Sequence, residues 1–105
     1  MMMRRRDLLV EAVAVEGQCP VYQVGDRFYL SKGYRLVSSK SCDVCLHALG
    51  SIMTFAVPLS ANLSIDDLGL GQGEDGVAHV QCLDPGPPLT DGGTVTFAIK
   101  CILPG

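Results

Sequence analysis

The residues best suited to chemistry in this 105-residue chain are its five cysteines. Cys42 and Cys45 form a Cys-x-x-Cys pair, Cys19 directly precedes a proline, and Cys82 stands just before a turn that contains proline and glycine. Cysteine sulfur is a preferred ligand of zinc and of iron–sulfur clusters, and rigid turns hold such sulfurs outward. We therefore predict that Cys19, Cys42, Cys45 and Cys82 bind an iron–sulfur cluster or a zinc ion.

The spacing of these cysteines leaves a second interpretation open. A zinc ribbon carries two Cys-x-x-Cys pairs, whereas this chain has one pair and two single cysteines. Cysteine is also among the most frequently buried residue types, so four unligated thiols that bind no metal are the alternative. Neither histidine joins the predicted ligands, because His47 is expected to lie away from the sulfur face of its helix and His79 on the surface of a strand.

Five short strands and one main helix are predicted around the cysteines. The strands are expected at Leu8–Val15, Arg27–Leu30, Tyr34–Val37, Gly76–Cys82 and Thr94–Ile102. A long loop is expected over Leu59–Gly76 and a turn region over Leu83–Gly93. Together these elements predict an α+β fold in which a small, mainly antiparallel sheet of about five strands has the helix packed on one face.

The predicted helix positions the Cys-x-x-Cys pair. Ser41 is a suitable N-cap, which would place Cys42 and Cys45 in the first helical turn with both sulfurs on the same side. The free amide hydrogens and the dipole at a helix start favour thiolate over thiol there. Apolar residues recur at helical spacing until Pro58, so we expect the helix to end near Ala56.

Cys101 is expected to differ from the other four cysteines. The last predicted strand alternates, with Val95, Phe97, Ile99 and Cys101 on one face and more polar residues on the other. Because the apolar face must pack against the rest of the domain, Cys101 is predicted to be a core residue.

The composition indicates one folded domain and argues against several classes of protein. Hydrophobic residues make up 48% of the chain and charged residues 18%, a balance unlike that of disordered chains. The net charge is −3 and three of the eight basic residues are Arg4–Arg6, so no distributed basic face is available for nucleic acid. No apolar run reaches 18 residues, so no membrane span is expected. We predict a disordered tip over residues 1–7 and one domain over residues 8–103.

The N-terminal segment determines the expected compartment. It starts basic and turns apolar like a secretion signal, but Asp7 and Glu11 interrupt the apolar stretch and no small-residue cleavage site follows. We therefore expect a cytoplasmic protein. Thiols stay reduced in the cytoplasm, so a permanent disulfide framework is not expected.

The chain resembles a small family of uncharacterised prokaryotic domains that is frequent in anaerobes. The resemblance covers roughly residues 9–102 and is carried by four short motifs. That family carries a Gly-x-Cys-Pro, a Gly-Asp-x-Phe, a cysteine three residues before an alanine in a helix, and a Cys-Pro-Asp near the end. The corresponding segments here are Gly17-Gln18-Cys19-Pro20, Gly25-Asp26-Arg27-Phe28, Cys45-Leu46-His47-Ala48 and Cys82-Leu83-Asp84.

The resemblance implies that Cys19, Cys45 and Cys82 are the important cysteines and that Gly25 and Asp26 form a structural turn. Cys42 is not part of the family pattern, so a four-sulfur site would be complete only in this chain. Leu83 also departs from the pattern, because it replaces the proline that normally follows the third cysteine. The family has no established activity that could be carried over.

The leading hypothesis is a metal- or iron–sulfur-binding module with an accessory or electron-transfer role. The alternative is a metal-free interaction or accessory subunit, in a homo-oligomer or with a protein partner, whose cysteines are structural and which needs no cofactor. A thiol enzyme that uses Cys42 and Cys45 as a redox pair is disfavoured. A thioredoxin-like domain needs alternating strands and helices, and only one helix is predicted here. We therefore expect binding rather than catalysis.

Overall fold

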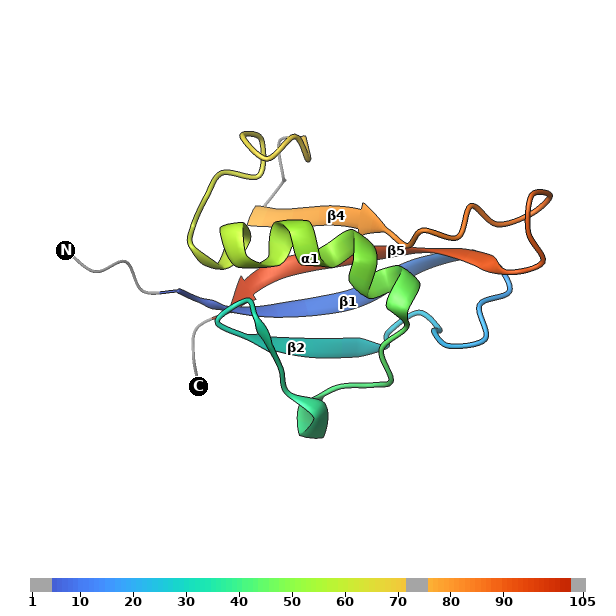
Figure 1. The fold of residues 1–105 in the computed structure, drawn as a ribbon, viewed down its shortest axis with the longest axis horizontal. Helices are drawn as coiled ribbons and strands as arrows, with labels where there is room; N and C mark the ends of the chain where they lie inside the picture. The colour runs from blue at the N-terminus through green and yellow to red at the C-terminus, as the bar shows by residue number, and fades with distance from the viewer. Residues whose placement is uncertain (1–4, 72–75, 103–105) are drawn as a thin grey trace.

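A computed structural model describes residues 5–71 and 76–102. Its elements in chain order are β1 (Asp7–Gly17), β2 (Arg27–Ser31), β3 (Arg35–Leu36), the short 3₁₀ helix η1 (Ser38–Lys40), α1 (Leu46–Ser60), β4 (Val77–Gln81) and β5 (Gly93–Ile102). The strands form one sheet in the order β3-β2-β1-β5-β4, and every neighbouring pair is antiparallel. The helix α1 crosses one face of this sheet (Figure 1). The predicted α+β fold with one main helix is confirmed.

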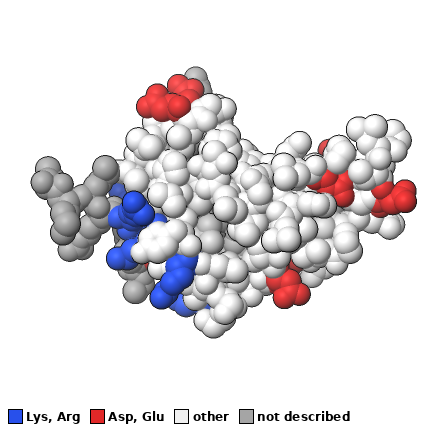
Figure 2. All heavy atoms as spheres, viewed as in Figure 1, with Lys and Arg blue, Asp and Glu red and all other residues white. Residues whose placement is uncertain are grey.

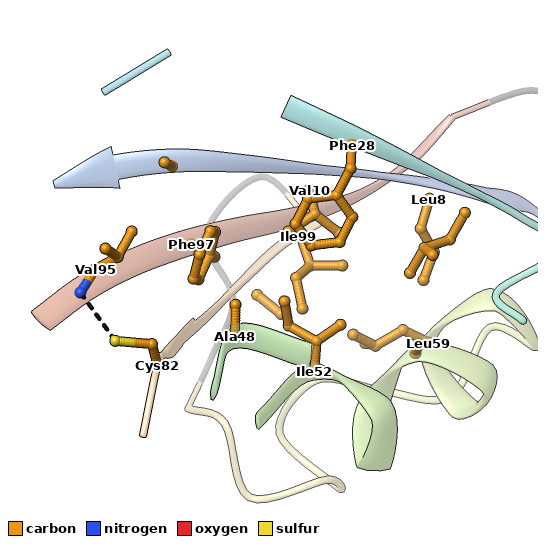
Figure 3. Close-up of a cluster of buried hydrophobic side chains, with 14 of the residues drawn as sticks. Leu8, Val10, Phe28, Ala48, Ile52, Leu59, Cys82, Val95, Phe97 and Ile99 are labelled. Atoms are coloured by element: carbon orange, nitrogen blue, oxygen red, sulfur yellow. Dashed lines mark hydrogen bonds between the residues drawn. The ribbon is translucent and has the colours of Figure 1, made fainter. Parts of the chain in front are cut away.

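The hydrophobic core lies between α1 and the sheet (Figure 3). The central strands β1 and β5 pair along their whole length, from Asp7 opposite Ile102 to Gly17 opposite Gly93. Since side chains alternate along a strand, one face of each strand supplies the core and the other faces away from α1. The core side chains that the sheet and helix bring together include Leu8, Val10, Ala12, Phe28, Ala48, Ile52, Leu59, Val95, Phe97 and Ile99.

The helix begins later than the sequence predicts. Its N-cap residue is Cys45, which has extended backbone angles, and Cys42 lies in the loop before it. Ser41, the predicted cap, is engaged elsewhere: its hydroxyl accepts a hydrogen bond from the Tyr29 N–H at 2.9 Å and donates one to a loop carbonyl at 2.7 Å. The prediction that Cys42 and Cys45 share the first helical turn is therefore wrong.

The helix also ends later than predicted, at Ser60 rather than near Ala56, and it includes Pro58. Proline disfavours a helix interior because it lacks the N–H donor. Here the residues after it gain tertiary contacts, since Leu59 and Ser60 are both buried and the Arg6 N–H donates a hydrogen bond to the Ser60 carbonyl at 2.8 Å. These contacts extend α1 by one turn beyond the predicted end.

The first strand begins inside the predicted tip. Asp7 belongs to β1, and its buried carboxylate accepts hydrogen bonds from the Tyr29 hydroxyl at 2.5 Å and from the Lys32 N–H at 2.8 Å.

Residues 1–4 of the predicted tip, 72–75 of the predicted loop and 103 of the predicted domain lie outside the described residues. Within the described ranges, no helix is long and apolar enough to cross a membrane.

Candidate functional site

Three segments that are distant in the sequence meet at one end of the sheet (Figure 1). They are the loop after β1, the N-cap of α1 and the residue that follows β4. These segments bring Cys19, Cys45 and Cys82 to the wall of a single pocket of about 240 Å³. We call it the cysteine pocket. Its wall also includes the apolar side chains of Pro20 and Val95.

Cys19 lies in a tight turn against the start of β5. The Tyr22 N–H donates a hydrogen bond to the Cys19 sulfur, with an N–S distance of 3.3 Å. A side chain at Gly93 would lie 2.9 Å from the Cys19 backbone nitrogen, so only glycine lets the two backbones approach this closely. The turn and this contact fix the Cys19 sulfur at the pocket wall.

Cys82 is held by the same end of β5. Its side chain is only 8% exposed, and its sulfur accepts a hydrogen bond from the Val95 N–H at 3.3 Å (Figure 3). The sulfur also lies 3.7 Å from the Gly93 carbonyl oxygen. The Cys82 N–H donates to the Val95 carbonyl, which extends the pairing of β4 with β5 by one residue. Cys82 thus has a fixed position between the core and the pocket.

Tyr22 connects Cys19 to Cys45. Its backbone N–H bonds to the Cys19 sulfur, and its hydroxyl oxygen accepts a hydrogen bond from the Cys45 N–H at 2.8 Å. The ring is buried and packs edge-on against Phe97, with 5.2 Å between the ring centroids. Burial raises the pKa of Tyr22 to about 12, and the neighbouring cysteine sulfurs add to this effect. At neutral pH the hydroxyl is therefore protonated.

Two further side chains with donor atoms line the pocket, His47 and Asp84. The Asp84 carboxylate accepts hydrogen bonds from the Thr90 hydroxyl and from the Gly86 N–H, the latter at 2.9 Å. These bonds, and the nearby His47 imidazole, lower the pKa of Asp84. The expectation that His47 lies away from the cysteines is wrong, because α1 starts at Leu46 and turns His47 toward the pocket.

The other two cysteines do not line the cysteine pocket. Cys42 is half-buried, with its N–H bonded to the Arg27 carbonyl at 2.9 Å. Burial raises the pKa of the Cys42 thiol, and the Asp26 carboxylate adds to the shift. Cys101, predicted to be in the core, is half-buried at its edge, with its sulfur 3.4 Å from the Leu59 carbonyl oxygen. Burial raises the pKa of this thiol as well.

All five cysteines are free thiols. Among residues 5–71 and 76–102, no three Cys, His, Asp or Glu side chains are placed to hold a metal ion. The four predicted ligands therefore do not surround one common point, as Zn–S bonds of about 2.3 Å would require.

Tyr22, His47 and Asp84 were not among the predicted site residues. Tyr22 and Asp84 each stand two or three residues after a predicted ligand, as Cys-Pro-Val-Tyr and Cys-Leu-Asp. Both contact the preceding cysteine sulfur through backbone atoms, the Tyr22 N–H and the Asp84 carbonyl, so their residue types carry no sequence signal for this contact.

No protein-family model, curated protein or solved structure matches this chain. Its function is therefore inferred from the geometry of its own residues.

Proposed function

We propose that this protein is an iron–sulfur-binding module, with an accessory or electron-transfer role, whose ligands are Cys19, Cys45 and Cys82. The observation that carries the proposal is that these three cysteines, from three separate segments, line one pocket. They are also the three that the family resemblance implicates. Cys42 is not part of the proposed site, since it does not line the pocket.

The shape of the pocket favours a cluster over a single zinc ion. One ion requires all its ligands within bonding distance of one point, and the described part of the chain holds no such group of three. A cluster instead binds its cysteines through iron atoms at the outside of a larger body, so its ligands need not all surround one point. A pocket of about 240 Å³ that is lined by three cysteines from separate segments suits the larger group.

The surroundings of the sulfurs support the same proposal. Backbone N–H groups donate to the sulfurs of Cys19 and Cys82. Hydrogen bonds of this kind orient ligating sulfurs and are one factor that sets the reduction potential of a cluster. His47 and Asp84 supply nitrogen and oxygen donors on the same wall for a fourth, non-thiol position. A bound cluster would supply one-electron transfer.

Anaerobic reconstitution with iron and sulfide tests this function. The wild-type protein is expected to bind iron and acid-labile sulfide and to gain the visible absorption of a cluster. Cys45→Ser and Cys82→Ser should lose most of the bound iron, because each removes one soft ligand. Cys42→Ser and Cys101→Ser are the matched controls and should keep it. Circular dichroism of every variant reports whether the fold is retained.

The same experiment separates the competing functions. Reconstitution with zinc in place of iron should give weaker loading that is less sensitive to Cys45→Ser. A folded wild-type protein that binds neither iron nor zinc would contradict the proposal and favour the alternative, a metal-free interaction or accessory subunit. Loss of iron in Cys42→Ser equal to the loss in Cys45→Ser would show that the ligand set is wrong.

A further inference from the structure

The helix α1 carries no Lys, Arg, Asp or Glu in its fifteen residues. Its inner side, which includes Ala48 and Ile52, is buried on the sheet. On its outer side Leu46 is 79% and Met53 63% exposed. The other exposed residues of α1 are His47, Gly50 and Thr54, so its outer side carries no acidic, lysine or arginine side chain between these two large apolar ones. An uncharged helix side with exposed apolar residues is suited to contact with another protein surface.

Neighbouring side chains extend this apolar surface. Tyr34, in the turn between β2 and β3, is 66% exposed and borders a groove of about 170 Å³ together with Met53. On the other flank, Leu83 is 63% exposed and lies over Gly50, where an added Cβ would be 3.0 Å from the Leu83 Cδ1 atom. We call Tyr34, Leu46, Met53 and Leu83 the α1 face. Adjoining apolar side chains of this kind mark interaction sites.

Basic residues gather at the C-terminal end of α1. The Arg6 N–H bonds to the carbonyl of Ser60, the last residue of the helix. The Arg5 guanidinium carbon lies 5.8 Å from the centroid of the Tyr34 ring. Lys32 stands next to Gly33, which packs closely on the end of α1: a Cβ added at Gly33 would be 2.6 Å from the Ser60 Cβ. One end of the α1 face is therefore positively charged.

Acidic residues gather at the opposite end. Asp84 lies close to His47 in the first turn of α1, and Asp43 stands two residues before the N-cap. Figure 2 shows an uncharged surface over α1, with basic atoms at one end and acidic atoms at the other. The loop after α1 carries a second acidic group, which lies to one side of the surface between the basic and acidic ends of α1 (Figures 1 and 2).

We propose that the α1 face binds a second copy of this chain, with the two α1 helices antiparallel. A two-fold axis through the middle of α1 would place the basic end of each copy on the acidic end of the other. The face is thus complementary to itself, as an isologous dimer interface must be. Met53 is the central residue of α1 and would meet its equivalent at the axis, where its flexible side chain fills an irregular gap. This inference does not depend on a cluster being bound in the cysteine pocket, although Asp84 and His47 belong to both sites.

Sedimentation velocity over a range of protein concentrations tests the interface. The wild-type protein is expected to be a dimer that dissociates on dilution. Met53→Lys should raise the dissociation constant by about 100-fold or more, because two unpaired charges would be buried at the axis. Met53 is exposed in one copy, so this variant should fold. Leu89→Lys is the matched control: Leu89 is 77% exposed, lies in the loop before β5, and should leave the dissociation constant unchanged.

Charge reversal tests the antiparallel arrangement. Lys32→Glu and Asp43→Lys should each weaken the dimer by about two- to tenfold, as exposed ion pairs do, and the double variant should recover most of the loss. At about 100 μM even a weak dimer should be populated, so a wild-type protein that stays monomeric at this concentration would overturn the proposal. So would equal effects of Met53→Lys and Leu89→Lys, or a double variant weaker than both single variants. A complex with a different protein in place of the dimer would also contradict it.

Discussion

Removing one oxygen atom from Tyr22 tests how the cysteine pocket is held together. Tyr22→Phe keeps the ring against Phe97 and keeps the backbone N–H that bonds to the Cys19 sulfur. It removes only the hydroxyl oxygen that accepts the Cys45 N–H at 2.8 Å. The N-cap side chain of Cys45 makes no capping hydrogen bond of its own. The Tyr22 hydroxyl is therefore the contact that fixes the start of α1 at the pocket.

The expected loss follows from this geometry. Tyr22 is only 5% exposed and Cys45 is half-buried, so the hydrogen bond that joins them lies at the pocket wall. The loss of a hydrogen bond of this kind costs about 0.5 to 1.5 kcal/mol of unfolding free energy. For a domain of this size, each 1 kcal/mol lowers the melting temperature by about 4 to 8 °C. The variant should also bind less iron on reconstitution, since Cys45 is less well fixed.

Chemical denaturation of the wild-type protein and of Tyr22→Phe measures this loss. Tyr34→Phe is the matched control, because Tyr34 is 66% exposed, and it should change the unfolding free energy by less than about 0.5 kcal/mol. If Tyr22→Phe is as stable as this control and binds as much iron as the wild-type protein, the Tyr22–Cys45 contact does not hold the pocket.

Two further predictions concern the sheet. Hydrogen bonds from the Tyr29 hydroxyl and the Lys32 N–H lower the pKa of Asp7 in the folded protein. They therefore stabilise the fold fully above the ordinary pKa of 3.8, and this stabilisation is lost as the pH falls through the lower pKa of the folded state. Unfolding titrations should show Asp7→Asn about 1.5 to 3 kcal/mol less stable than wild type at pH 6, with the difference shrinking below pH 3.8; a difference independent of pH would contradict this. Gly33→Ala would place a Cβ 2.6 Å from the Ser60 Cβ, whereas the same change at Gly71, with a similar φ of 82°, meets nothing within 4 Å. Thermal melts should therefore show a larger loss at Gly33 than at Gly71, and equal losses would refute the packing of this turn on α1.

The sheet could be predicted from the sequence because its pattern is local. The residues 94–102 alternate apolar and polar, and β5 spans Gly93–Ile102 with Val95, Phe97 and Ile99 on the core side. The same alternation placed Cys101 on the core side, and Cys101 packs against the core, with its sulfur 3.4 Å from the Leu59 carbonyl oxygen. It is only half-buried because it lies near the end of β5, which the alternation alone does not show.

The start of the helix could not be predicted because distant partners decide it. Ser41 is a good N-cap by composition, yet its hydroxyl bonds to the Tyr29 N–H, twelve residues earlier. The Cys45 N–H is instead taken by the Tyr22 hydroxyl, 23 residues earlier. With these two contacts, Cys42 lies in the loop before the helix and Cys45 is its extended N-cap. A Cys-x-x-Cys spacing alone does not distinguish this loop from a helical turn.

The candidate site, too, could be predicted where it depends on local sequence and not where it depends on distant contacts. The turn residues beside Cys19 and Cys82 favoured outward-facing sulfurs. Both cysteines line the pocket, but Cys82 is buried and its sulfur accepts a hydrogen bond from the Val95 N–H. Which cysteines share it depends on the pairing of β4 with β5 and on the position of α1, and neither is contained in a short motif. His47 lines the pocket only because α1 starts after Cys45.

The most direct measurement of the proposed ligand set is the rate at which iodoacetamide alkylates each cysteine, followed by mass spectrometry before and after anaerobic reconstitution with iron and sulfide. We predict that alkylation slows at Cys19, Cys45 and Cys82 together and stays unchanged at Cys42 and Cys101. Slowing at Cys42 in step with the others, or unchanged rates at all five cysteines, would contradict a cluster held by the three cysteines of the pocket.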